Sequence, residues 1–191
     1  MDTKEWLDVK HKNDDNVKGG QTKSSRTDKW QKPGAEWVKC NYDVSNHAGR
    51  QDSGLGWIIR NSQGTCLDCG CGKFQGRQTI EEAECTALIW AIQCAWGLGY
   101  RRVEFEGDNI TVNRLIRNKE TNPRLRYYLE FIQQWSKAFT TVKFTFRHRE
   151  QNVCADVLAK KAVANHINHT LYHFCPGFLM SFVNKDAEHV N

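Results

Sequence analysis

The 191-residue chain has no apolar run long enough to cross a membrane, and its first 32 residues lack the apolar core of a secretory signal. We therefore expect an intracellular protein, nuclear or cytoplasmic, that is neither secreted nor attached to a membrane. A strong excess of one charge is also missing, since the net charge is +5. This mildly basic balance is compatible with a nucleic-acid partner but does not demonstrate one.

Disulfides are not expected among the eight cysteines, because a reducing compartment keeps thiols free. We expect these cysteines to act as small apolar side chains. Cys66, Cys69 and Cys71 are close enough in sequence to suggest zinc, but no second cysteine pair with standard spacing accompanies them. A structural zinc site is therefore the less favoured alternative for this segment.

Three regions differ in composition. Residues 1–32 are polar, mix basic with acidic side chains and show no sustained period, which predicts a disordered arm or linker. Pro33 and Gly34 mark the boundary of a single folded domain over residues 33–165. Residues 166–191 have no strong period, so we expect a C-terminal tail that packs weakly at most.

The domain alternates between two kinds of pattern. Period-two alternation and turn residues predict strands, and apolar stripes with N-terminal capping signals predict helices. The expected strands cover 37–44, 54–60, 65–74, 102–106 and 141–147. The expected helices cover 79–96, 109–118, 123–137 and 152–165. This order predicts an α/β fold, a mixed five-stranded sheet flanked by helices.

Four acidic residues belong to four different predicted elements: Asp43, Glu84, Asp108 and Asp156. Carboxylates that a fold gathers at one point repel each other unless cations neutralise them, and oxygen-only clusters suit Mg²⁺ or Mn²⁺. Two such ions can activate a water and stabilise the leaving oxygen of a phosphodiester. The four acids therefore predict a metal-dependent nuclease.

Ordinary structural explanations also exist, and for Glu84 the alternative is a solvated acid near the helix start, helped by the helix dipole. Asp108 can cap the helix that follows it, and Asp156 can be a first-turn acid of the last helix. Asp43 lies within an expected strand, where aspartate is disfavoured. Glu84 lies on an apolar helical face, where burial of a carboxylate is costly, so a metal-binding role is favoured for it. Together the four ordinary explanations require four coincidences on the right elements.

The segments that surround these acids are residues 37–43, 82–88, 106–109 and 149–160. In this order they resemble ribonuclease H domains, and most of all the plant RNase H-like domains of non-LTR retroelement reverse transcriptases. The resemblance covers about two thirds of the chain. It implies an RNase H-like fold with strand order 3-2-1-4-5 and cleavage of the RNA strand of RNA–DNA hybrids. It also implies two Mg²⁺ ions, replaceable by Mn²⁺, held by Asp43, Glu84, Asp108 and Asp156.

Polar residues beside the acids are candidates for substrate binding: Asn41, Ser45, Asn109 and Asn152. In an RNA–DNA hybrid the 2′-hydroxyls of the wide minor groove distinguish RNA from DNA, and Asn41 and Ser45 flank Asp43 as candidates for that contact. Asn152 lies near the last acid and is a candidate for a bond to the attacking water or to the substrate backbone.

The chain departs from the family pattern at two positions. Val44 follows the first aspartate, where many members have glycine, and Phe146 stands ten residues before Asp156, where many have histidine. His148 is the candidate substitute for proton transfer or product release. The alternative for His148 is a surface histidine in an arginine-rich loop.

Two other functions are considered, of which one remains open and the other is disfavoured. A nucleic-acid-binding module without useful catalysis is kept open by Val44 and Phe146, although all four acids are present. A 3′–5′ exonuclease of the same superfamily is disfavoured, because such enzymes resemble one another in a second acid two residues after the first, where this chain has Ser45. The expected protein is thus a monomeric ribonuclease H.

Overall fold

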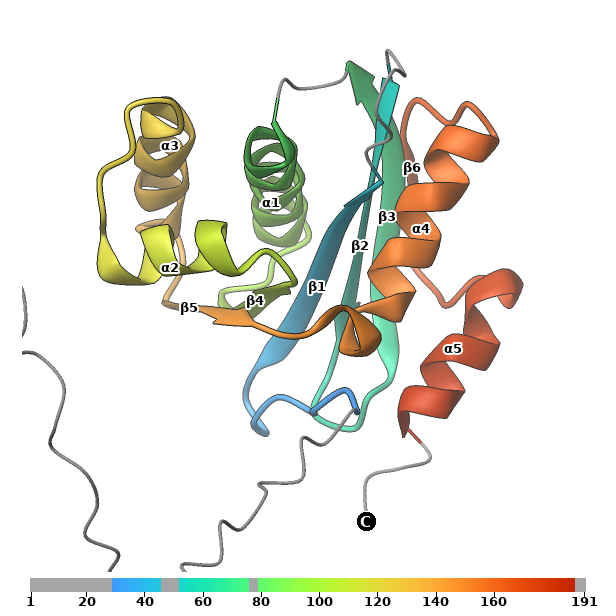
Figure 1. The fold of residues 1–191 in the computed structure, drawn as a ribbon. Helices are drawn as coiled ribbons and strands as arrows, with labels where there is room; N and C mark the ends of the chain where they lie inside the picture. The colour runs from blue at the N-terminus through green and yellow to red at the C-terminus, as the bar shows by residue number, and fades with distance from the viewer. Residues whose placement is uncertain (1–28, 46–51, 76–78, 188–191) are drawn as a thin grey trace, which may run out of the picture.

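The computed structural model describes residues 29–45, 52–75 and 79–187. One twisted sheet separates two helical layers, with α1, α2 and α3 on one face and α4 and α5 on the other (Figure 1). The strands are β1 (Val38–Ser45), β2 (Asp52–Arg60), β3 (Cys66–Gln75), β4 (Arg102–Gly107), β5 (Thr141–Phe146) and β6 (Thr170–Tyr172). The helices are α1 (Ile80–Gly97), α2 (Ile110–Asn118), α3 (Arg126–Ser136), α4 (Val153–Ala164) and α5 (Gly177–Ala187), and a 3₁₀ turn, η1 (Arg149–Gln151), precedes α4.

The strands follow the order β5-β4-β1-β2-β3-β6. β1, β2 and β3 form an antiparallel meander, whereas β4 pairs parallel with β1 and β5 pairs parallel with β4. The expected mixed sheet and its order are confirmed. The expected number of strands is wrong, because β6 adds a sixth strand antiparallel to β3.

Two apolar clusters lie on opposite faces of the sheet. The larger one joins β1, β2 and β4 to α1, α2 and α3 through side chains such as Trp57, Leu88 and Phe105. The smaller one joins Ile58 and Leu158 to the C-terminal segment. Neighbouring strand residues alternate between faces, so Trp57 and Ile58 enter different clusters. All eight cysteines are free, as expected.

Local capping chemistry fixes where α1 begins. The Thr79 hydroxyl accepts a hydrogen bond from the Glu82 backbone N–H, and the Glu82 carboxylate accepts one from the Thr79 backbone N–H. This reciprocal pair is a capping box, and it satisfies two N–H groups that the helix leaves unbonded. Because the start is fixed, Glu84 is placed on the second turn of α1, facing the sheet.

α4 lies unusually close to β2. A Cβ atom at Gly54 would stand 2.1 Å from the carbonyl oxygen of Ala159, and one at Gly56 would stand 2.5 Å from that of Ala155. Only glycine fits against helix backbone at these distances. The two glycines therefore allow α4 to carry Asp156 toward the end of β1.

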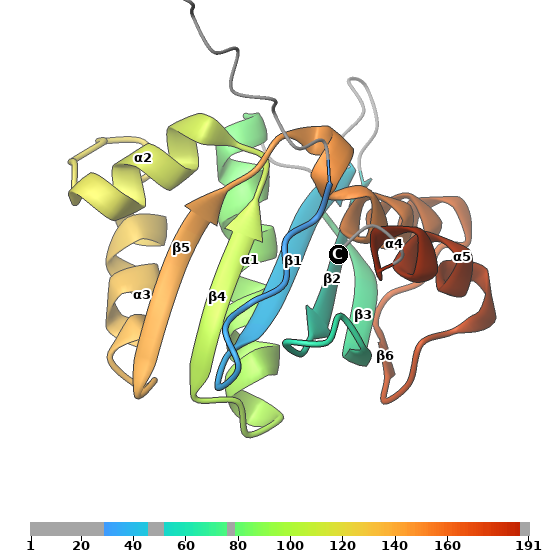
Figure 2. The ribbon, with the colours of Figure 1, turned by 90° about the horizontal axis from the view of Figure 1, so that it is seen from below.

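The two ends of the described chain are more ordered than the sequence predicts. Residues 166–191 were expected to form a tail, but β6 joins the sheet and α5 buries Leu179 and Val183 in the smaller apolar cluster. Of the expected arm, residues 1–28 lie outside the described residues, whereas Trp30 is buried. Figure 2 shows the segment before β1 crossing β1 and β4 on the face of the sheet opposite α1. Among the described residues, no helix has both the length and the apolarity to span a membrane.

Candidate active site

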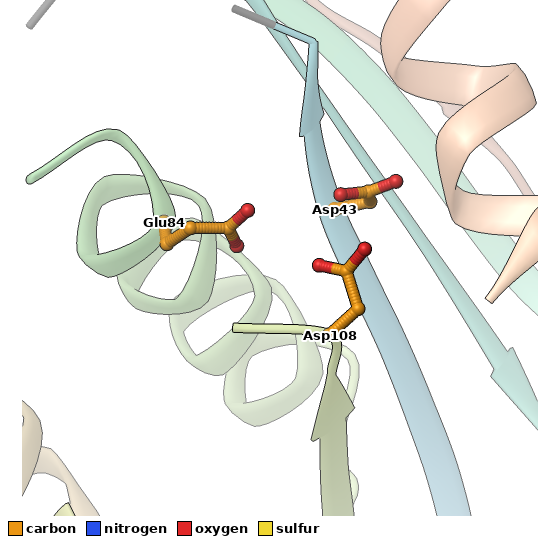
Figure 3. Close-up of side chains that lie close together, drawn as sticks. All are labelled: Asp43, Glu84 and Asp108. Carbon is orange, nitrogen blue, oxygen red and sulfur yellow. The ribbon is translucent and has the colours of Figure 1, made fainter. Parts of the chain in front are cut away.

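Three carboxylates meet at one edge of the sheet (Figure 3). Asp43 comes from β1, Asp108 directly follows β4, and Glu84 projects from α1. Carboxylate oxygens of the three residues lie within 4.8 Å of one another. β1 and β4 are parallel neighbours, so their carboxyl ends reach the same edge, which explains why residues far apart in sequence meet there.

Burial makes this arrangement electrostatically costly. Asp43 and Glu84 are only 2% and 3% exposed. Burial, followed by the nearby Asp108 carboxylate, raises the pKa of Asp43 to about 8. Burial and the neighbouring Asp43 raise the pKa of Glu84 as well, and burial raises that of Asp108. Each shift arises because the charged form loses water and faces like charge.

The oxygens of this cluster are poorly satisfied. Asp43 Oδ1 accepts a hydrogen bond from the Val44 backbone N–H, but Asp43 Oδ2 and Glu84 Oε2 find no partner among the described residues. Buried polar atoms without partners are rare in folded proteins, so these two oxygens indicate a site that binds an ion or ligand. A donor set made of carboxylate oxygens alone fits a hard divalent cation such as Mg²⁺ or Mn²⁺.

Asp156, the fourth expected acid, is held differently. Its Oδ2 lies 2.6 Å from Nζ of Lys160, one helical turn later, and its Oδ1 lies 3.5 Å from an Arg149 guanidinium nitrogen. It therefore forms ion pairs with two cations and is not one of the three converging carboxylates, although its buried Oδ1 accepts no hydrogen bond from the described residues. Its charge nonetheless contributes to the raised pKa of Asp43, so it lies close to the cluster.

A cleft of about 270 Å³ opens over the cluster. Ser45 and Asn109, two of the predicted substrate-binding residues, line this cleft. Arg149 and Lys160 line the cleft as well, so positively charged groups stand beside the three carboxylates. Sequence reasoning missed both cations. Two features of the sequence could have indicated them. Arg149 begins the segment 149–160, and Lys160 follows Asp156 by four residues, the spacing of an ion pair on a helix.

The other predicted site residues lie outside the cleft. Asn41 is buried, where its amide donates to Glu106 and its oxygen accepts from Trp30 and Arg60. Asn152 is also buried. His148 is exposed and packs against the edge of Phe146, with ring centroids 5.2 Å apart. On this loop it is thus the guanidinium of Arg149, and not the imidazole of His148, that reaches the carboxylates.

No cysteine takes part in a metal-binding group in the described part of the chain, where the three-carboxylate group is the one found. Cys69 and Cys71 are instead buried in the smaller apolar cluster, with Cys66 packed against it. The less favoured zinc alternative therefore gains no support from the fold.

Comparisons with known proteins agree with this geometry. A family model described as reverse transcriptase-like matches residues 41–162. A ribonuclease HI of Halobacterium salinarum is 28% identical over 128 residues, which are 66% of this chain and 64% of the relative. The match thus spans slightly less than two thirds of that relative's length.

Two solved structures share the fold. The crystal structure of RNase H1 from the halophilic archaeon Halobacterium salinarum NRC-1 has a TM-score of 0.63 and 26% identity, and the match covers 68% of this chain and 98% of that one. LC11-RNase H1, solved in complex with an RNA/DNA hybrid, has a TM-score of 0.61 and 21% identity, with coverage of 68% and 98%. At the latter identity the likeness concerns the fold alone.

Proposed function

This chain belongs to the reverse transcriptase-like family and has the RNase H fold, and on that basis we propose that it is a metal-dependent ribonuclease H, which hydrolyses the RNA strand of RNA–DNA hybrids. The observation that carries the proposal is the meeting of Asp43, Glu84 and Asp108 within 4.8 Å. Two relatives add support, because one is named as a ribonuclease HI and another was solved with an RNA/DNA hybrid.

The first divalent cation would be held by Asp43, Glu84 and Asp108, because their carboxylate oxygens converge. Two of these oxygens, one from Asp43 and one from Glu84, are buried and have no partner among the described residues. Asp156 would contribute to a second ion once Lys160 and Arg149 release its carboxylate. When bound, Mg²⁺ or Mn²⁺ supplies an acidified water and charge stabilisation for the departing 3′ oxygen, which leaves a 5′-phosphate.

The side chains of the cleft would bind and orient the RNA. Arg149 has a planar guanidinium that suits two non-bridging oxygens of one phosphate, and Lys160 adds a second positive charge. Ser45 and Asn109 also line the cleft, and we assign their hydroxyl and amide groups to the ribose 2′-hydroxyl. Asn109 uses its oxygen to cap α2 through the Val112 N–H, so its amide nitrogen is the group left to donate.

Asn41, Asn152 and His148 have other roles in this proposal. Both asparagines are buried and bonded within the protein. Asn41 donates a hydrogen bond to the buried Glu106 carboxylate, and Asn152 donates one to the Tyr42 backbone carbonyl oxygen. His148 has no direct part in proton transfer, because it lies outside the cleft. On this loop it is Arg149, and not His148, that would contact the substrate phosphate.

A second cleft of about 320 Å³ is lined by residues at the start of α1, in α2 and in the segment before α3. Its lining includes hydroxyl, amide and guanidinium groups of Thr79, Thr111, Asn122 and Arg124, together with one carboxylate, that of Glu81. The hydroxyl, amide and guanidinium groups suit a backbone phosphate, and we assign this cleft to the strand paired with the RNA.

The first test compares cleavage of a labelled RNA–DNA hybrid, single-stranded RNA and duplex DNA in Mg²⁺, in Mn²⁺ and in EDTA. Asp43→Asn runs beside the wild type to exclude a contaminating nuclease. The proposal expects cleavage of the hybrid alone, dependent on metal and absent in the variant. Cleavage that persists in EDTA, or that is as fast in Asp43→Asn as in the wild type, would refute the proposed function.

One observation favours a second candidate, a hybrid-binding module with weak catalysis. Asp156 forms ion pairs with Lys160 and Arg149 and is not among the three carboxylates that converge. Hybrid binding without cleavage in saturating Mn²⁺ would select this module. Under either candidate we infer a monomer from a plant retroelement of the non-LTR type, and the reverse transcriptase-like family match supports the retroelement part.

A further inference from the structure

Trp30 lies outside the active site but is 1% exposed, although it precedes the first strand. Its indole ring stands 3.6 Å from the Arg60 guanidinium carbon and 5.6 Å from Nζ of Lys39. The indole N–H donates to Oδ1 of Asn41 at 2.8 Å. Trp30 is thus bound to side chains of β1 and β2.

The residues on either side of Trp30 hold the loop that leads into α4. The Lys29 carbonyl oxygen accepts a hydrogen bond from the Gln151 side chain at 2.9 Å. The Gln31 side-chain oxygen accepts one from the Arg147 guanidinium at 2.7 Å. Arg147 and Gln151 each stand two residues from Arg149, so the segment 29–31 holds the Arg149 loop on both sides.

The buried cations near Trp30 have their own anchors. Lys39 donates to Glu106 at 2.9 Å, and Arg60 pairs with Asp186 at 2.6 Å. Lys39 also donates a hydrogen bond to the Gln31 carbonyl oxygen at 2.8 Å, so this bond and the burial of the indole together position the segment 29–31. That segment has no helix or strand of its own, so its position depends on side-chain contacts of this kind.

We propose that Trp30 is a positioning residue of the active site, which by its burial fixes the two oxygens of Lys29 and Gln31 that hold the loop carrying Arg149. The proposal rests on the proposed function for its catalytic consequence, since it assigns the substrate phosphate to Arg149. Its structural part concerns how rigidly residues 147–152 are held, and it can be tested without substrate.

The structural part is tested by amide hydrogen exchange on the full chain without metal, well below the unfolding temperature. The reporters are the amides of Gln151 and Asn152, which donate to the carbonyls of His148 and Arg149. In Trp30→Ala we expect exchange of these amides to accelerate by about tenfold or more, because local opening no longer has to break the contacts to segment 29–31.

Two further variants keep this test decisive. Gln31→Ala removes one exposed side chain and its bond to Arg147, so it changes the loop even if Trp30→Ala unfolds the protein. Ile132→Ala is the matched control, because Ile132 is fully buried in the larger cluster between α3 and α1. Loop exchange that stays at the wild-type rate in both Trp30→Ala and Gln31→Ala, or rises equally in Ile132→Ala, overturns the proposal.

The catalytic part is tested by a double-mutant cycle on hybrid cleavage. If Trp30 acts through Arg149, Trp30→Ala lowers kcat/KM in the wild type but adds little to the loss in Arg149→Ala, and Trp30→Phe restores most of it. Additive losses would show that Trp30 does not act through Arg149. A wild type that fails to cleave hybrids refutes the proposed function, while the exchange experiment still decides the role of Trp30.

Discussion

The side-chain amide of Asn152 donates a hydrogen bond to the backbone carbonyl oxygen of Tyr42 at 2.8 Å. This bond joins the first residue before α4 to the strand residue directly before Asp43. Tyr42 is buried under Gly107, where a Cβ atom would stand 2.6 Å from the Tyr42 hydroxyl. The Asn152 bond therefore sets the spacing between the elements that carry Asp43 and Asp156, and it explains why an asparagine stands there.

Asp43→Asn is expected to abolish hybrid cleavage, with a loss of at least about a hundredfold, because it removes a charged oxygen from the metal-binding group. The same variant should be more stable than the wild type in EDTA, since it removes the cost of burying this carboxylate and its repulsion with Asp108. Thermal unfolding with and without Mg²⁺ measures this. Added Mg²⁺ should raise the Tm of the wild type and leave that of the variant nearly unchanged. Asp52→Asn, the same exchange at a half-buried strand residue, should respond to Mg²⁺ as the wild type does.

The stability of the metal-free protein should fall as the pH rises. The pKa of Asp43 lies at about 8 in the folded protein, above its ordinary value of 3.8, so between these values the folded protein binds more protons than the unfolded chain. Glu84 and Asp108 are shifted in the same direction. Each unit of pKa shift is worth at most about 1.4 kcal/mol. Urea unfolding in EDTA at about pH 5 and about pH 9 measures the difference. An increase in stability over this range would contradict the raised pKa values.

Arg149 and His148 should differ sharply in their effect on activity, although they are neighbours. Arg149→Ala is expected to lower kcat/KM by about 10- to 100-fold, because a charge-assisted contact to phosphate is lost. His148→Ala should change kcat/KM by less than about threefold, since the imidazole is exposed outside the cleft. Steady-state kinetics on one hybrid compares the two. A larger effect at His148 would return proton transfer to that residue.

Lys160 should control access to the fourth carboxylate. Lys160→Ala removes the ammonium 2.6 Å from Asp156, so Asp156 becomes available to a cation, and we expect the weaker of two Mn²⁺ binding steps to tighten several-fold. Lys160→Arg keeps the charge and should retain the wild-type affinity. Calorimetric titration of Mn²⁺ into each protein provides the measurement. Identical isotherms for the wild type and Lys160→Ala would show that Lys160 does not restrain Asp156.

The C-terminal helix should contribute to the stability of the whole domain. Leu179 is fully buried against the smaller apolar cluster, so Leu179→Ala is expected to cost about 2–4 kcal/mol of unfolding free energy. Its neighbour Met180 is 51% exposed, and Met180→Ala should cost less than about 0.5 kcal/mol. Denaturant titration of both variants checks this. Equal effects would mean that α5 is not part of the cooperative unit.

Local patterns in the sequence were enough to place most helices and strands. The alternation from Val38 to Val44, the capping signal at Thr79 and Glu82, and the stop at Gly97 all depend on neighbours within a few residues. Backbone hydrogen bonds and caps act over the same short range, so the sequence predicts them well. The exceptions were β6 and α5, where no strong period marks residues that are ordered by packing on β3 and α4.

The amino-acid sequence by itself determined which acids are present, on which elements they lie, and that several of them can share one cation. Only the tertiary structure decided which partners they have: Asp156 pairs with Lys160 and Arg149, Asn41 and Asn152 are buried, and Trp30 lies under Lys39 and Arg60. The physical reason is range. Periodicity and capping are fixed within one or two turns of chain, whereas a buried charge or amide takes its partner from whichever distant segment the packing of helices on the sheet brings within about 3 Å.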